Sequence, residues 1–317
     1  IQALPDGTHS YFDYLDNDGI DLDKSIKIEV SVRIMGDSVE INFLGTDQQV
    51  RGPFNLMPSG AYAAAYFAVH AMTDPSIPTN GGCFRPIKLV LPPKSIVNPE
   101  EPAPVNARTS TMKRVAGCII GALGQFVPER APADAAGEML LLAFGGDRID
   151  GTRYVVGELI ASGSGASEGK DGVDVIETDG TNCMNLPVEA LEMDVPIRVH
   201  KTELNTGSGG SGKFRGGLGL VREYEILHGT VVFTYRGERH NHPARGLMGG
   251  EPGGKAYSKI KRRDGKEIVI KSKTVETLET GDQILVQTAG GGGYGCPTER
   301  PEHLQRNDIA DRKTLDC

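Results

Sequence analysis

The densest group of side chains that could do chemistry lies at residues 236–242, where the sequence reads RGERHNH. On an extended segment His240 and His242 point to the same side, and Glu238 shares that side. Two imidazoles and a carboxylate could bind a divalent metal ion, and Glu238 could instead act as a general base. The guanidinium of Arg239 could hold a carboxylate through two parallel hydrogen bonds. Metal binding, anion or substrate binding and an ordinary exposed charged loop all stay open for this segment.

A second polar stretch covers residues 174–185 and leads into Pro187. A short helix that begins near Pro187 would place Asn182 and Asn185 close to its N-terminus, where the backbone N–H groups favour anions. Substrate or interface contacts by these two amides are one hypothesis for the stretch. Capping and turn chemistry is the other.

Four consecutive glycines, Gly290, Gly291, Gly292 and Gly293, form a third candidate. Consecutive glycines free the backbone for positive φ and leave its N–H groups available as anion donors. A close approach of two backbones explains such a run equally well. The sequence therefore leaves a backbone anion site and a packing loop as alternatives.

Two further segments resemble ligand-binding loops but lack the residues that those loops need. Residues 207–214 read GSGGSGKF, in which Phe214 replaces the hydroxyl residue that holds magnesium in a phosphate-binding loop. The acidic run at residues 13–23 resembles a calcium loop, yet its first and twelfth ligand positions fall on Tyr14 and Ser25. We expect a turn between strands for the first segment and a solvated acidic turn for the second.

The elements that must position these residues differ between the two halves of the chain. Period-two alternation predicts a hairpin, and apolar residues at helical spacing predict two to three helices in the first half. The expected elements are hairpin strands at 27–34 and 38–43 around a turn at 35–37, a helix over 61–72 with Ser59 as its N-cap, a strand at 87–90, a helix over 109–126 and a shorter helix within 132–142.

The second half reads as strands separated by glycine loops. The expected strands are 154–160, 196–204, 219–227, 231–236, 256–260, 268–271 and 284–287, with a hairpin turn at 263–265 and a short helix at 187–192. A mixed α/β first half and a mostly antiparallel second half predict an α+β fold. We divide the chain into a mixed α/β region, 1–150, and a β-rich C-terminal region, 151–317.

Composition narrows the function classes. The chain has 317 residues with 34 basic and 42 acidic side chains, so its net charge is −8 and it lacks the basic footprint of a nucleic-acid-binding protein. No apolar run approaches the roughly 20 residues that span a bilayer. The five cysteines are scattered without a C-x-x-C pair, which favours a cytoplasmic protein without a disulfide framework. The start at Ile1 instead of Met suggests a processed or truncated polypeptide.

A series of short segments runs through most of the chain in a fixed order. They are PDGT at 5–8, DNDG at 16–19, FLGT at 43–46, GPFN at 52–55, NGGCFRPI at 80–87, DGVD at 171–174, TNCMNLPVE at 181–189, GGSGKFRGGLG at 209–219, GLMGG at 246–250 and TAGGGGYG at 288–295. Together they resemble the hydantoinase B / 5-oxoprolinase C-terminal (HyuB-like) family, which includes related subunits of acetone and acetophenone carboxylases.

The resemblance implies a multisubunit, ATP-dependent enzyme. Family members work beside a hydantoinase A-like (HyuA-like) partner with an actin-like fold, and that partner would bind ATP and Mg. The pair phosphorylates a carbonyl or enol oxygen, after which a lactam or imide ring is opened by water or a ketone is carboxylated with bicarbonate. The family's divalent metal, Zn or Mn, would lie in an N-terminal HyuB-like part that precedes the start of this chain.

The resemblance therefore predicts the C-terminal part, or a split subunit, of a cytoplasmic cyclic-amide hydrolase that is inactive alone and acts on a small molecule in a hetero-oligomer. A subunit of a ketone carboxylase and a non-catalytic scaffold are the alternatives. By motif position, Asn182, Asn185, Arg239 and Glu238 would make substrate or interface contacts. Many relatives carry a histidine just before the Thr-Asn segment, where this chain has ETDG at 177–180.

Overall fold

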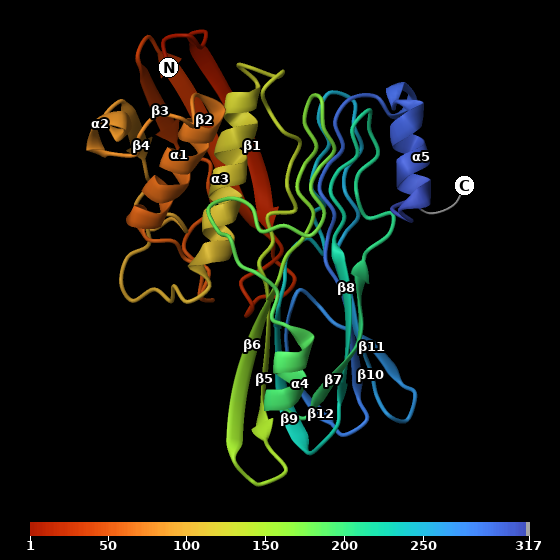
Figure 1. Ribbon diagram of the computed structural model, residues 1–317. Coiled ribbons are helices and arrows are strands. Elements are labelled where there is room, and N and C mark those ends of the chain that lie inside the picture. The colour runs from red at the N-terminus through yellow and green to blue at the C-terminus, as the bar shows by residue number, and fades with distance from the viewer. Residues whose placement is uncertain (315–317) are drawn as a thin grey trace.

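A four-stranded sheet organises the first core of the protein, whose computed structural model describes residues 1–314 (Figure 1). Its strands lie in the order β1 (Gly7–Leu15), β2 (Ile26–Met35), β3 (Ser38–Asn42) and β4 (Ile87–Val90). The first three strands pair antiparallel and β4 joins β3 in parallel. The expected hairpin is confirmed, and Gly36 takes a φ of 60° in its turn.

Two long helices, α1 (Pro58–Met72) and α3 (Arg108–Gly124), pack against each other, and α3 also packs on β1 and β2. Both helices were expected. The predicted N-cap at Ser59 is wrong, because the helix already begins at Pro58, whose fixed φ suits the first turn, and Met57 precedes it without a side-chain cap. A four-residue helix, α2 (Gly81–Phe84), lies between α1 and β4.

The second core is a sandwich of two antiparallel sheets, and Phe144 of one sheet packs on Tyr224 of the other. One sheet has the order β11 (Glu267–Val269), β10 (Tyr257–Lys261), β13 (Gln283–Gln287), β8 (Leu220–Ile226), β7 (Ile197–Leu204), and the other has β12 (Lys273–Glu279), β9 (Thr230–Arg236), β5 (Leu140–Asp147), β6 (Arg153–Ile160). Helices α4 (Val188–Asp194) and α5 (Glu302–Ala310) and a short 3-10 turn, η1 (Pro297–Glu299), complete the chain. The fold is α+β.

The third helix expected within 132–142 does not form. Residues 132–139 form neither a helix nor a strand, and β5 begins at Leu140. The N–H groups of Ala133 and Ala136 donate to the carbonyls of Ala166 and Gly163 at 2.8 and 3.0 Å. Distant segments therefore satisfy the backbone that a helix would have satisfied locally.

The glycine-rich segments of the second half lie side by side as a bundle of extended chains next to α5 (Figure 1). The N–H groups of Gly290, Gly291, Gly292 and Gly293 donate at 2.9–3.1 Å to the carbonyls of Gly254, Gly217, Asp134 and Glu251, in that order. The first and the fourth glycine thus face one neighbouring segment, and the two between them face two others. A three-residue repeat of this kind is typical of polyproline II geometry.

The glycines of this bundle are needed because they lack a side chain. A Cβ atom at Gly291 would lie 1.9 Å from the carbonyl oxygen of Ser164, and one at Gly292 would lie 2.0 Å from that of Arg245. None of residues 290–293 has a positive φ, so that part of the sequence interpretation is wrong. Since all four N–H groups already bind carbonyls, close packing explains the run and an anion site does not.

Two negative findings concern the described residues alone. Within residues 1–314, the helices are too short or too polar to cross a membrane. Four cysteines, Cys83, Cys118, Cys183 and Cys296, lie in this range and are free.

Candidate functional site

A buried ionic cluster lies where β1 crosses α3. The carboxylate of Asp13 pairs with Arg114 at 2.8 Å and with Arg239 at 3.0 Å, and all three side chains are buried. The expectation of a solvated acidic run at 13–23 is therefore wrong for its first part. Asp16 is also buried, and its carboxylate accepts hydrogen bonds from the backbone N–H groups of His240 and Asn241 at 2.8 and 3.1 Å.

Replacing Asp13 with asparagine is expected to lower the free energy of unfolding by about 3–5 kcal/mol, since two buried guanidinium groups lose their counter-charge. Burial raises the pKa of Asp13, but Arg114 and Arg239 outweigh it and lower the pKa to about 2. The stabilisation is therefore complete above the pKa of about 4 of the unfolded chain and is lost as the pH falls towards 2.

Urea unfolding of wild type and Asp13→Asn at several pH values measures this effect. The difference between the two proteins should shrink below pH 4. Asp23→Asn, in the exposed part of the same acidic run, is the matched control and should change little. A difference that stays constant between pH 7 and pH 3 would contradict the ion-pair explanation.

A pocket of about 340 Å³ opens beside this cluster. Its walls come from one face of α3, from the segment 132–137, from the loop 164–173 and from residues 178 and 179. The polar side chains that line it include Asp13, Lys113, Asp134, Ser164, Asp179 and Arg239. The pocket thus lies at the junction of the first core and the glycine bundle, and residues far apart in the sequence meet there.

Two residues of the pocket have strained backbones. Asp179 and Arg239 have φ angles of 60° and 66°, in the left-handed region that side chains other than glycine rarely adopt. Such conformations cost free energy and gather at active sites and ligand clamps. Their presence in one pocket marks it as the candidate functional site.

Asp179 is the group best suited to carry a proton. Burial raises its pKa, and the nearby Lys113 and the hydroxyl of Thr178, which donates to it at 3.0 Å, do not compensate. A half-buried carboxyl with a raised pKa can donate and accept a proton closer to neutral pH than an exposed one.

Lys113 holds the Asp179 loop in place. Its ammonium group contacts the carboxylate of Glu177 at 2.9 Å and the carbonyl of Thr178 at 2.6 Å, and the side chain is fully buried. The same carboxylate of Glu177 accepts the hydroxyl of Thr181. Lys113 thus fixes the residues before Asp179 from helix α3, and Glu177 binds Thr181 after it.

Asp134 supplies a second carboxyl to the pocket. It accepts the hydroxyl of Tyr11 at 3.0 Å and the backbone N–H of Arg245 at 3.3 Å. Burial, followed by the charge of Asp13, raises the pKa of Asp134. The pocket therefore offers two carboxyl groups that can accept N–H groups of a small polar ligand, with proton transfer available at Asp179.

Of the residues proposed from sequence for substrate or interface contact, only Arg239 lines this pocket. Its guanidinium is already bound by Asp13 and by the carbonyls of Ala135 and Ala136, at 3.0 and 2.7 Å. Arg239 therefore holds the wall together. Glu238 is buried outside the pocket, where it binds Lys273 at 2.6 Å.

The two histidines do not act as a pair. His240 binds the hydroxyl of Tyr235 at 2.8 Å, and His242 binds that of Ser25 at 2.9 Å. The left-handed backbone at Arg239 breaks the extended segment on which the shared orientation depended. Burial lowers the pKa of His240 to about 4. Among residues 1–314, no three His, Cys, Asp or Glu side chains are arranged to hold a metal ion, so the histidine site has no geometric support.

Asn182 and Asn185 lie in an exposed segment that leads into α4, and neither lines the pocket. Met184 between them is 90% exposed. A substrate or interface contact by these amides stays a prediction.

Sequence reasoning missed Asp13, Lys113, Arg114 and Asp134 as site residues. One signal was present, because Lys113 and Arg114 stand side by side in a helix whose following residues are apolar. Adjacent charges that interrupt an apolar pattern indicate buried ion pairs or a site.

The chain is similar to known proteins in sequence and in structure. The family model described as Hydantoinase B/oxoprolinase matches residues 1–297. The B-type subunit of a D-/L-hydantoinase from Pseudomonas sp. strain NS671 is 31% identical over 324 residues, which cover 98% of this chain and 54% of that protein.

Two solved structures have the same fold. The ATP-dependent caprolactamase from Pseudomonas jessenii matches with a TM-score of 0.88 and 28% identity, over 99% of this chain and 56% of that one. Nucleotide-free acetone carboxylase matches with a TM-score of 0.87, over 99% of this chain and 49% of that one, and at 19% identity it shows the fold alone. The chain thus spans about half the length of each of these proteins.

Proposed function

The chain belongs to the hydantoinase B/oxoprolinase family, and we propose that it is part of the B-type subunit of an ATP-dependent enzyme that opens cyclic amides. The hydantoinase and the ATP-dependent caprolactamase, which align with nearly the whole chain, support this choice. The observation that carries it is the pocket in which Asp179, strained and with a raised pKa, faces a space large enough for a small cyclic amide.

The pocket residues would have separate roles in ring opening. The carboxylate of Asp134 accepts the N–H group of the amide and orients the ring. As the C–N bond breaks and water supplies the oxygen of the new acid, the ring nitrogen must gain a proton. Protonated Asp179 donates that proton, which turns a poor leaving group into a neutral amine, and the proton that the attacking water loses restores the carboxyl group of Asp179. Lys113 keeps the carboxyl in its strained position throughout.

ATP would bind to a HyuA-like partner chain, because the glycine-rich segment of this chain does not fit a nucleotide. Gly210, Lys213 and Phe214 donate their N–H groups to carbonyls of residues 291, 295 and 294 at 2.9–3.1 Å. A phosphate-binding loop needs those N–H groups free. Residues 1–314 likewise offer no fitting ligand set for a divalent metal, and no step is assigned to one.

One experiment tests the proposal together with its two alternatives, a ketone carboxylase subunit and a non-catalytic scaffold subunit. A tagged form of the complete natural protein is purified from its host and its partners are identified by intact-mass spectrometry. We expect a HyuA-like ATPase chain, and ATP-dependent opening of lactams or imides by the complex. Turnover only of ketones with bicarbonate would indicate the carboxylase. A complex without turnover would indicate the scaffold, and a chain without such a partner would contradict the proposal.

A further inference from the structure

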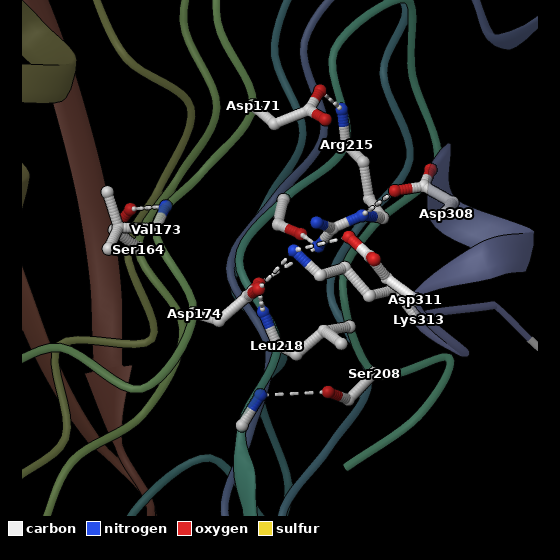
Figure 2. Close-up of polar contacts among 12 residues, drawn as sticks. Ser164, Asp171, Val173, Asp174, Ser208, Arg215, Leu218, Asp308, Asp311 and Lys313 are labelled. Atoms are coloured by element: carbon white, nitrogen blue, oxygen red, sulfur yellow. Dashed lines mark hydrogen bonds and ion pairs between the residues drawn. The ribbon is translucent and has the colours of Figure 1, made fainter. Parts of the chain in front are cut away.

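The outer wall of the pocket, the loop 164–173, is held in place by the C-terminal segment of the chain. Figure 2 shows part of this network: Asp308 of α5 contacts Arg215, and Lys313, which follows the helix, contacts Asp174. Asp171 lines the pocket, and Asp174 follows directly after the loop. Both aspartates are bound by basic residues from other segments.

Arg300 lies just before α5 and binds both the loop and the helix. Its guanidinium donates two parallel hydrogen bonds to Asp171, at 2.9 and 2.8 Å, and a third to Asp308 of α5 at 2.6 Å. A bidentate bond of this kind fixes orientation as well as distance. On its other side Asp171 accepts the backbone N–H of Arg215 at 2.7 Å, so the carboxylate is fully engaged (Figure 2).

Asp174 is the second anchor. It accepts the N–H of Leu218 at 2.9 Å and pairs with Arg215 at 3.2 Å and with Lys313 at 3.1 Å (Figure 2). Burial raises the pKa of Asp174, but these three partners outweigh it and the pKa falls below its ordinary value. The wall is thus held at both aspartates by charges that come partly from beyond residue 299.

The helix itself docks through charge. Asp308 is the only buried residue of α5, and it is shared between Arg300 and Arg215. The catalytic side of the pocket does not depend on this helix, because Lys113 of α3 holds the Asp179 loop. The wall and the proton donor are therefore fixed by separate sets of contacts.

We propose that Arg300 is a positioning residue that sets the substrate-binding wall of the pocket through Asp171, with Lys313 supporting it through Asp174. The inference rests on the proposed function for the identity of the ligand. Loosening the wall should weaken substrate binding and leave the chemical step intact. KM should then rise with little change in kcat, as expected when uniform binding is lost.

The test compares Arg300→Gln with Arg306→Gln in the complete enzyme. Arg306 lies on the neighbouring helix α5 and, among residues 1–314, pairs with the exposed Glu302 alone, so it is a matched control. We expect about a tenfold rise in KM for Arg300→Gln, in line with the loss of a charged hydrogen bond, and kcat within about twofold of wild type. Arg300→Lys keeps the charge but loses the bidentate hydrogen bond of the guanidinium, so its KM should lie between those of wild type and Arg300→Gln.

Hydrogen exchange of residues 167–174 provides a readout that does not depend on activity. Exchange there should be at least about tenfold faster in Arg300→Gln and unchanged in Arg306→Gln. Unchanged exchange would overturn the positioning role, even if the lactam activity is confirmed. Faster exchange with unchanged KM would overturn the assignment of this wall to the substrate. If Arg300→Gln fails to fold, Lys313→Met, which removes the ion pair with Asp174 and the weaker one with the exposed Asp311, takes its place with the same expected direction.

Discussion

Replacing Gly291 with alanine is expected to lower the free energy of unfolding by about 4 kcal/mol or more, a large share of the roughly 5–15 kcal/mol that stabilises a folded protein. The new Cβ would lie 1.9 Å from the carbonyl oxygen of Ser164 and 2.7 Å from the N–H nitrogen of Gly165. Both neighbours are backbone atoms that are themselves fixed by the bundle, so neither can move away cheaply. Urea or thermal unfolding of the purified protein measures the loss.

The control is the same substitution at Gly117. This glycine lies within α3, and a Cβ there would meet no atom within 4 Å. Alanine at an interior helix position should stabilise the protein by about 0.5–1 kcal/mol. Opposite signs at the two positions are the expected result. A Gly291→Ala protein as stable as wild type would show that the bundle is not closely packed.

Replacing Asp179 with asparagine is expected to lower kcat about 100-fold or more in the assembled enzyme, the usual size of a general acid's contribution. Asparagine tolerates the left-handed backbone nearly as well as aspartate, so the loop should keep its shape. Asparagine has nearly the same volume as aspartic acid but has no carboxyl proton to donate. Burial raises the pKa of Asp179. If Asp179 donates the proton, wild-type activity should fall as the pH rises through that pKa, and the variant should lack this limb of the profile.

Two controls accompany this variant. Asp264→Asn lies in the exposed β10–β11 turn and should behave as wild type. Unfolding measurements on Asp179→Asn should show little change in stability. An Asp179→Asn enzyme with wild-type kcat and an unchanged pH profile would remove Asp179 from the chemistry and leave the pocket without its proton donor.

The sequence predicts those helices and strands whose residues follow a clear local pattern of apolar and polar side chains. The hairpin of β2 and β3 follows from alternation, and α1 and α3 follow from helical spacing. The segment 132–139 has the alanine-rich composition of a helix, yet its N–H groups donate to residues 163, 166 and 245, which lie far along the chain. Strand β1 was not predicted as a strand, and its pairing with β2 sets it in place.

The site was less predictable because its charges are paired over long distances. Arg114 binds Asp13, 101 residues away, and Lys113 binds Glu177, 64 residues away. No spacing in the sequence links such partners. Asp179 stood within the polar stretch singled out from the sequence, but its strain and its buried surroundings appear only in the folded chain. The glycine run was noticed for its backbone freedom, whereas its role is to let neighbouring chains approach.

The most direct test of the account is the stoichiometry of ATP use by the complete enzyme. The complete natural protein and the proposed HyuA-like partner are purified together and incubated with ATP and a panel of lactams and imides. Ring-opened product and ADP are then measured over the same time course. We expect ring-opened product and ADP to appear in equal amounts, and only when the cyclic amide is present. Both amounts should fall together in Asp179→Asn. ADP release that does not depend on any cyclic amide but requires a ketone and bicarbonate would contradict the proposed ring opening.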